Sequence, residues 1–247
     1  MSNILGVKID NLSGEEILER IEAFLAEPKF HQIATINPEL VLAAQKNVNF
    51  RDILNKCDLC VADGFGIACA FRKKLDCLKC RMTGVDLAEK ILEIAEGRGL
   101  GVFLACRKDG LSNYEEVKKA LLKKYPRLKI DGQDINFPVI ASEVKQSLKS
   151  ADEIATVATL PRNDVLLCNF GAPEQEFFIE SQKNDTIRLG IGVGGTFDFW
   201  TGKVKRAPIL MRKIGLEWLW RLVQQPRRIG RIWRAVIIFP IRVIFNK

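Results

Sequence analysis

Histidine and long apolar runs are scarce in this sequence. Its 247 residues include one histidine, His31, so neither a metal site built from histidines nor a serine triad is expected. No apolar run reaches the roughly 18 residues that suggest a membrane-spanning helix, and the N-terminus lacks the basic and apolar segments of a secretory signal. Seven cysteines, an odd number in a chain of this length, argue against a secreted disulfide framework and favour a reducing cytoplasm.

Acidic residues are nearly missing from the C-terminal segment. Between Lys203 and Lys247 there are twelve Lys or Arg residues and one acid, Glu217. This segment carries a charge of +11, and because the whole chain carries +8, the remainder is −3. A near-neutral body with a basic tail predicts an anionic partner, which is either a membrane surface or a nucleic acid.

The rest of the composition is that of a globular protein, with 47% hydrophobic and 28% charged residues. Short apolar runs predict strands at residues 32–36, 59–62, 100–105, 128–130, 165–170 and 187–193. Helical patterns separate most of them, so we expect an α/β fold with a mostly parallel sheet. Residues 1–207 are assigned to this core and 208–247 to a helical appendage, while residues 138–163 fit no clear pattern.

Capping signals mark where several helices begin. Ser13 and Thr83 each open a capping box, and Asn37 precedes a proline at the first helical position. The helix after Thr83 is expected to stop at Gly97.

Four polar or glycine-rich segments follow predicted strands. They are 35–37, 63–66, 171–176 and 192–198. Because parallel strands end at one edge of a sheet, we expect these segments to converge on a ligand site there. Asp63 would project into that site, and Gly64 and Gly66 would let a ligand approach the backbone. Each segment also has a purely structural interpretation, since Asp63-Gly64 can be a turn and Asn37 a helix cap.

Two further motifs suggest other proteins. Residues 190–195 match G-x-G-x-x-G, but no strand that ends in an acid follows, so a nicotinamide site is disfavoured and the glycines are read as room for a phosphate. Cys57, Cys60, Cys77 and Cys80 have the spacing of a zinc ribbon. Against zinc, Cys60 lies inside the apolar run that leads to Asp63, where a small hydrophobic residue is expected.

The basic tail has amphipathic patterns. Residues 208–225 repeat apolar side chains at helical spacing, and Arg227, Arg228, Arg231 and Arg234 then alternate with isoleucine and tryptophan. This pattern predicts a helix that lies in an anionic membrane interface with those four arginines on lipid phosphates. The alternative is a helix packed on the core with its arginines in solvent.

Several of these motifs, in order along nearly the whole chain, resemble the WecG/TagA/CpsF glycosyltransferases, which form glycosyltransferase family 26. The matching segments are Thr35-Ile36-Asn37-Pro38-Glu39, Ala62-Asp63-Gly64-x-Gly66-Ile67, Arg81-Met82-Thr83-Gly84-x-Asp86-Leu87, Gly171-Ala172-Pro173-x-Gln175-Glu176, Gly194-Gly195-x-Phe197-Asp198-Phe199, Gly202 to Pro208, Gly215 to Leu222, and Gln225-Pro226-x-Arg228. Residues 138–163 depart from the family pattern.

The resemblance implies a Rossmann-like core and an inverting transfer that needs no metal or other cofactor. The donor would be a UDP-sugar of the N-acetylmannosamine type, and the acceptor a polyprenyl-diphosphate-linked sugar used for cell-surface polysaccharide or teichoic acid. It also implies a peripheral protein on the cytoplasmic face of the membrane, held there by its tail. The exact sugars and any homo-oligomer stay open.

The resemblance also implies site residues. Asp63 would be the base, and Thr35, Arg81 and Gln175 would share its pocket. A carboxylate suits the removal of a hydroxyl proton, and arginines suit the charge that develops on departing UDP. The expected substrate-binding residues are Asn37, Gly64, Gly66, Thr83, Gly171, Pro173, Gly194, Gly195, Thr196, Asp198, Arg206, Arg212, Arg221 and Arg228. The alternative function is a nucleotide- or nucleic-acid-binding α/β protein whose tail contacts phosphates, although apolar residues among the arginines favour lipid.

Overall fold

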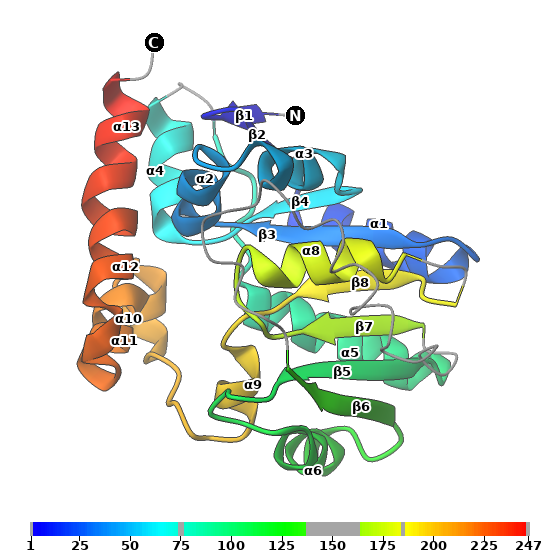
Figure 1. The fold of residues 1–247 in the computed structure, drawn as a ribbon. Helices are drawn as coiled ribbons and strands as arrows, with labels where there is room; N and C mark the ends of the chain where they lie inside the picture. The colour runs from blue at the N-terminus through cyan, green and yellow to red at the C-terminus, as the bar shows by residue number, and fades with distance from the viewer. Residues whose placement is uncertain (1, 74–76, 137–163, 184–185, 246–247) are drawn as a thin grey trace.

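The computed structural model describes residues 2–73, 77–136, 164–183 and 186–245. At its centre is a six-stranded sheet in the order β4-β3-β8-β7-β5-β6, and every neighbouring pair is parallel (Figure 1). The strands are β3 (His31–Ile36), β4 (Leu59–Ala62), β5 (Gly101–Arg107), β6 (Lys129–Ile135), β7 (Val165–Cys168) and β8 (Leu189–Gly192). The predicted α/β class with a mostly parallel, Rossmann-like sheet is confirmed.

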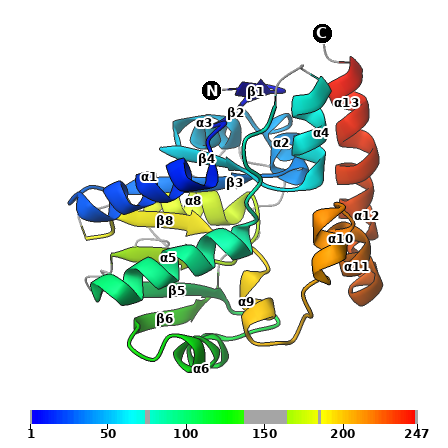
Figure 2. The same cartoon turned by 180° about the vertical axis from the view of Figure 1, so that it is seen from behind.

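Helices cover both faces of the sheet, as the front and back views show (Figures 1 and 2). One face carries α1 (Gly14–Ala26), α5 (Gly84–Arg98) and α6 (Tyr114–Lys124), and the other carries α2 (Pro38–Ala44), α3 (Val48–Lys56) and α8 (Glu174–Ser181). Because both faces are covered, strands such as β4 and β7 are buried at every residue, which explains their uninterrupted apolar sequences.

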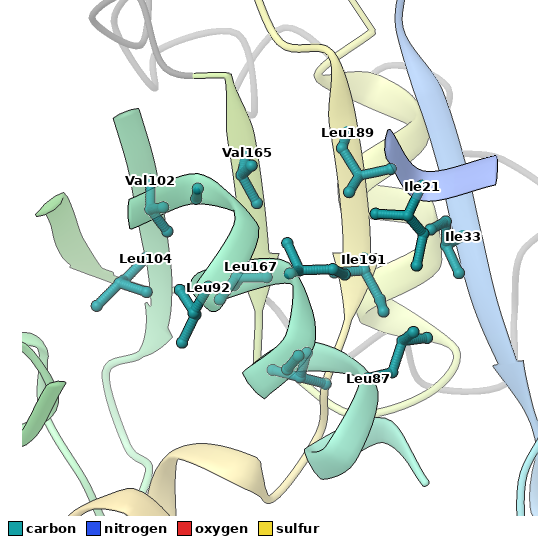
Figure 3. Packing of buried hydrophobic residues seen from close by; sticks show 14 of the residues in the cluster. Ile21, Ile33, Leu87, Leu92, Val102, Leu104, Val165, Leu167, Leu189 and Ile191 are labelled. Atoms are coloured by element: carbon teal, nitrogen blue, oxygen red, sulfur yellow. The ribbon is translucent and has the colours of Figure 1, made fainter. Parts of the chain in front are cut away.

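The largest core cluster lies under α1 and α5. Figure 3 shows Leu87 and Leu92 of α5 and Ile21 of α1 above strand residues such as Leu167 and Ile191. These side chains are almost completely removed from water, and each such burial contributes roughly 1.5–3 kcal/mol of hydrophobic stabilisation. This packing fixes the sheet on which the site is built.

The helix caps follow the sequence with two corrections. Ser13 forms a complete capping box with Glu16. Thr83 caps α5, but the Thr83 hydroxyl donates to the Asp86 carboxylate at 2.6 Å, so the box is not completed through the Thr83 backbone. The helix α5 ends at Gly99, which has a left-handed φ of 65°, and not at Gly97. The expected stop at Gly97 was wrong because that residue stays helical.

Several short elements were not expected. β1 (Ser2–Ile4) and β2 (Val7–Ile9) form an antiparallel hairpin, α4 (Phe65–Lys73) follows the Asp63 turn, and α9 (Thr196–Trp200) follows β8. The strand β6 extends to Ile135, well past residue 130. As an edge strand it is largely polar, so its apolar pattern is weak. Residues 138–163, whose conformation was left open, lie outside the described residues.

The tail is helical but interrupted. It contains α10 (Ile209–Lys213), α11 (Glu217–Gln224), a short turn at Pro226–Arg228, and a continuous run of α12 (Ile229–Trp233), η3 (Arg234–Ile238) and α13 (Phe239–Phe245). The prediction of a single helix over residues 208–225 is therefore wrong. Gly215 breaks it with a φ of 80°, and its backbone lies so close to Phe65 that a Cβ would stand 2.4 Å from the ring.

The long terminal helix has two faces. Phe239 and Val243 are buried in a cluster with Ile67 and Phe71 of α4. This face therefore packs on the core, which was the alternative to a helix lying in the membrane interface. The opposite face stays exposed and apolar through Ile229, Trp233, Ile237, Ile241 and Ile244. No helix within the described ranges is both long and apolar enough to cross a bilayer.

Candidate functional site

The four predicted strand-end segments do converge. β4, β3, β8 and β7 are consecutive in the sheet, and the residues after them line one cavity of about 680 Å³. The tail closes its other side. The predicted residues that line it are Thr35, Asn37, Asp63, Gly64, Gly66, Arg81, Thr83, Gly171, Gln175, Gly194, Gly195, Thr196, Asp198, Arg221 and Arg228.

Asp63 is held rigidly at the end of β4. Its backbone N–H donates to the Ile36 carbonyl at 2.7 Å, and the Met82 N–H donates to the Ala62 carbonyl at 3.1 Å. The carboxylate Oδ2 accepts the Gly84 N–H at 3.5 Å. The end of β4 is therefore joined by hydrogen bonds to β3 and to the segment at the start of α5.

The surroundings of Asp63 tune its charge. Burial, followed by the negative charge of Glu217, raises the pKa of Asp63 from 3.8 to about 6. The Gly84 N–H and the cations Arg221 and Arg81 oppose that shift. With a pKa just below neutral, Asp63 is ionised at pH 7 and remains a much better proton acceptor than an ordinary aspartate, as a general base requires.

Thr35 and Arg81 flank Asp63. Thr35 is the next-to-last residue of β3, and its Oγ1 is 3.5 Å from where a Cβ on Gly84 would stand, so it lies against the start of α5, which contacts Asp63. The Arg81 Nη2 donates to the Arg212 carbonyl at 2.8 Å. Arg81 therefore joins the core to the tail at the cavity wall. Asn37 does cap α2, since its Oδ1 accepts the Glu39 and Leu40 N–H groups, and it also lines the cavity.

Two glycines of β8 are required by packing. Gly190 faces Ile179, and Gly192 faces the Gln175 side chain, each too closely for a Cβ. The N–H groups of Gly194 and Thr196 donate to Gln175 Oε1 and to the Val193 carbonyl, so they are already used. The dinucleotide interpretation is contradicted, because these glycines seat α8 and Glu217 lies on a helix.

Three predicted substrate-binding residues do not line the cavity. Arg206 donates to the Thr83 hydroxyl at 3.1 Å and to the Asp86 carboxylate at 2.6 Å, so it holds the start of α5. Arg212 offers its carbonyl to Arg81. Pro173 lies immediately before α8. Their positions depend on tertiary partners that the linear motif does not show.

Other residues that line the cavity were not expected. Glu39 of α2 and Arg231 of α12 both face it and form an ion pair, with Arg231 Nε donating to Glu39 Oε2 at 2.9 Å. Glu217 and Trp218 of α11, and Arg107 at the end of β5, also line it. Glu39 and Glu217 stand inside the family motifs, so position within those motifs was the available signal.

The cysteines are dispersed. A hydrogen bond with Cys60 and burial raise the pKa of the Cys57 thiol well above its ordinary value. Cys77 is exposed and Cys80 half-buried. Within the described part of the chain, no three His, Cys, Asp or Glu side chains are grouped to hold a metal ion.

The fold and the cavity together define an enzyme class. A Rossmann-like sheet places one activated carboxylate beside several arginines at its carboxyl edge, which suits a group transfer with a phosphate leaving group. The chain belongs to the WecG/TagA/CpsF family of glycosyl transferases, whose sequence model matches residues 2–247. The protein is therefore a glycosyltransferase.

Curated relatives carry the name N-acetylglucosaminyldiphosphoundecaprenol N-acetyl-beta-D-mannosaminyltransferase. The protein from Staphylococcus aureus strain MW2 is 29% identical over 248 residues, which cover 98% of this chain and 91% of the relative. The proteins from strains NCTC 8325 and MRSA252 are also 29% identical to this chain, with the same coverage of both sequences.

Proposed function

We propose that this enzyme transfers an N-acetylmannosamine-type sugar from a UDP donor to a polyprenyl-diphosphate-linked N-acetylglucosamine, with inversion at the anomeric carbon. The observation that carries the proposal is Asp63, with its pKa of about 6, on the floor of a cavity that arginines also line. The names of the relatives support the choice of donor sugar and acceptor.

The reaction follows from this geometry. Asp63 takes the proton of the acceptor hydroxyl, the hydroxyl oxygen bonds to the anomeric carbon, and the bond from that carbon to UDP breaks on the opposite face. UDP leaves with the bonding electron pair. One base and one displacement give inversion.

The arginines supply the charge that UDP needs as it leaves. Burial and the neighbouring cations Arg221 and Arg231 lower the pKa of Arg228 to about 10. The Arg221 guanidinium lies over the Phe199 ring at 4.6 Å. Cations crowded in this way are stabilised when an anion enters among them, and most so when its negative charge grows in the transition state. No metal is required for that step.

The tail offers a place for a lipid-linked acceptor. Its inward side lines the cavity with Ile232, Ala235, Val236 and Pro240, and its outward face is the exposed apolar stripe described above. Together with the basic charge, these two faces suit a helix that lies on the cytoplasmic surface of an anionic membrane and receives a prenyl chain from it. This placement also suits a role in cell-wall polysaccharide or teichoic acid synthesis.

A nucleic-acid partner is less favoured. Arg221, Arg228 and Arg231 face the cavity, and on the outward surface isoleucine and tryptophan stand among the exposed Arg227, Arg234 and Arg242. A surface that binds nucleic-acid phosphates would expose arginines without large apolar side chains between them. Vesicle flotation run beside a DNA mobility-shift assay separates the two, since binding to DNA without binding to vesicles would contradict the membrane interpretation.

The test of the function uses Asp63→Asn with a panel of UDP-sugars and a polyprenyl-diphosphate-GlcNAc acceptor in EDTA. The wild type should transfer N-acetylmannosamine, and the variant should bind UDP normally while turnover falls about 10²-fold or more. Ionising Asp63 costs stability between pH 3.8 and about 6, so above pH 6 the variant should melt no lower than the wild type. Near-normal turnover would rule out Asp63 as the base.

A further inference from the structure

We infer that Glu176 is a positioning residue for this transfer: its buried carboxyl orients the Gln175 amide, which holds together the two loops that form the cavity floor. The inference rests on the proposed function for its catalytic consequence. The family motif placed Gln175 among the groups that act on substrate, but its contacts show a different use.

The Gln175 side chain fills the space left by a glycine. It lies in the first turn of α8 and is 5% exposed. A Cβ on Gly192 would stand 2.3 Å from Gln175 Nε2 and 2.8 Å from its Cγ. The end of β8 therefore has to be glycine for this side chain to reach the cavity floor.

One oxygen of Gln175 joins two loops. Gln175 Oε1 accepts the Gly171 N–H at 3.2 Å and the Gly194 N–H at 3.1 Å. Gly171 belongs to the loop after β7 and Gly194 to the loop after β8, and both have a left-handed backbone. These loops line the cavity, so the Gln175 oxygen sets the distance between two of its walls.

Glu176 decides which way the amide points. Gln175 Nε2 donates to Glu176 Oε1 at 2.7 Å. If the amide were turned over, its NH₂ group would face the two N–H donors of the loops, and the carbonyl would face a carboxyl oxygen. The acceptor oxygen at position 176 and the two loop N–H donors together select the working orientation.

Glu176 is itself fixed in the core. It is 2% exposed, its carbonyl accepts the Gln32 Nε2 at 3.3 Å, and its Oε2 has no hydrogen-bond partner among the described residues. The ionisable groups that interact with it are the Cys57 and Cys168 thiols and Glu174, and no cation of the described residues is among the groups that shift its pKa. Burial raises the pKa of Glu176 to about 8, so the carboxyl is uncharged at pH 7.

Two substitutions at Glu176 separate positioning from general stability. Glu176→Gln keeps an acceptor oxygen and cannot ionise, while Glu176→Met fills similar space and offers no acceptor. Ile179→Ala is the matched control, because it removes buried packing from the same helix and leaves the polar chain intact. Each folded variant is assayed for UDP affinity by calorimetry, for donor KM and kcat, and for hydrogen exchange at Gly171 and Gly194 without ligand.

The Met variant should weaken UDP binding about tenfold or more, the scale of losing a buried hydrogen bond, and should lose protection at both glycines. The Gln variant should stay within about threefold of the wild type. The control should melt earlier with UDP affinity unchanged. A Met variant with wild-type UDP affinity and protection would overturn the inference, as would equal weakening in the control.

A pH series gives a second test that needs only the wild type and Glu176→Gln. Above about pH 8 the wild type should gain protection at Gly171 and Gly194 relative to the Gln variant, because an ionised Glu176 is a stronger acceptor for the Gln175 amide than the neutral carboxyl. Equal protection, or weaker protection in the wild type, would contradict the inference. If the protection differs as expected while the wild type binds no UDP, the positioning role stands and the proposed function fails.

Discussion

At the scale of single residues, the chemistry depends on what faces Asp63. Its own segment supplies only the carboxylate and a tight turn. The groups that set its pKa come from Arg81 in the loop before α5, from Gly84 at the start of α5, and from Glu217 and Arg221 in the tail. A side chain about 150 positions away in the sequence therefore shares control of the proton acceptor.

The pH dependence of turnover should report this arrangement. With Asp63 as base, kcat/KM should rise with pH through an apparent pKa of about 6. Glu217→Gln removes a negative charge that raises the pKa of Asp63, so the acidic limb should move to lower pH. The measurement is kcat/KM for the donor from pH 4.5 to 8.

Glu19→Gln is the control for that shift, because Glu19 is an exposed acid on α1, away from the cavity lining. Its profile should overlay that of the wild type. An acidic limb that stays in place in Glu217→Gln would show that Glu217 does not act on the base.

At the scale of elements, the terminal helix gives adjacent residues different surroundings. Val236 lines the cavity and Ile237 belongs to the outward stripe. Both lie in the π-helical turn Arg234–Ile238, a local feature that is frequent at functional sites. One helix can therefore meet a membrane on one side and the acceptor on the other.

Paired substitutions test this division. Val236→Asp should raise the KM for a long-chain lipid acceptor about tenfold, because a charge would stand where a prenyl chain packs, and should leave UDP affinity near normal. Ile237→Asp should instead weaken flotation with anionic vesicles and leave turnover on a short-chain acceptor unchanged. Identical effects of the two variants on both assays would contradict the two-sided helix.

At the scale of the whole molecule, the tail completes a cavity that the core leaves open. The sequence assigned Arg227, Arg228, Arg231 and Arg234 together to lipid phosphates. The structure instead turns Arg228 into the cavity and pairs Arg231 with Glu39. The proposed membrane contact therefore depends on the exposed Arg227 and Arg234.

Truncation after Pro208 should therefore cause two losses. The remaining core should no longer float with anionic vesicles, and it should lose transfer to a short soluble acceptor because Arg221 and Arg228 are gone. It should also melt lower, since removal of Phe239 and Val243 uncovers Ile67 and Phe71. Flotation, transfer and thermal melting are measured on the same preparation.

The full-length variant Arg227→Glu/Arg234→Glu is the matched control. Each basic residue near an anionic surface contributes roughly 1 kcal/mol of binding, so this variant should lose flotation and keep transfer to the soluble acceptor. Full transfer by the truncated core would mean that the tail is only an anchor. Undiminished flotation of the truncated core would contradict the membrane role of the tail.

The sequence by itself determined the six strands of the central sheet, the capped starts of several helices and the edge at which the site forms. Residues 59–62 could be recognised because a strand buried on both faces must be apolar throughout, and Ser13 because a cap acts within one helical turn. The position of Asp63 in the site could be predicted from these local rules, since ligands bind at the carboxyl ends of parallel strands.

Only the tertiary structure decided which side chains act together. Three features depend on partners far along the chain. Arg206 donates to Asp86, Gly215 interrupts the tail where it lies against Phe65, and Gln175 hydrogen-bonds two loops at once. Periodicity and capping reflect forces between near neighbours in the sequence. The pKa of Asp63 and the direction of each arginine are set instead by burial and charge from segments that meet only after folding.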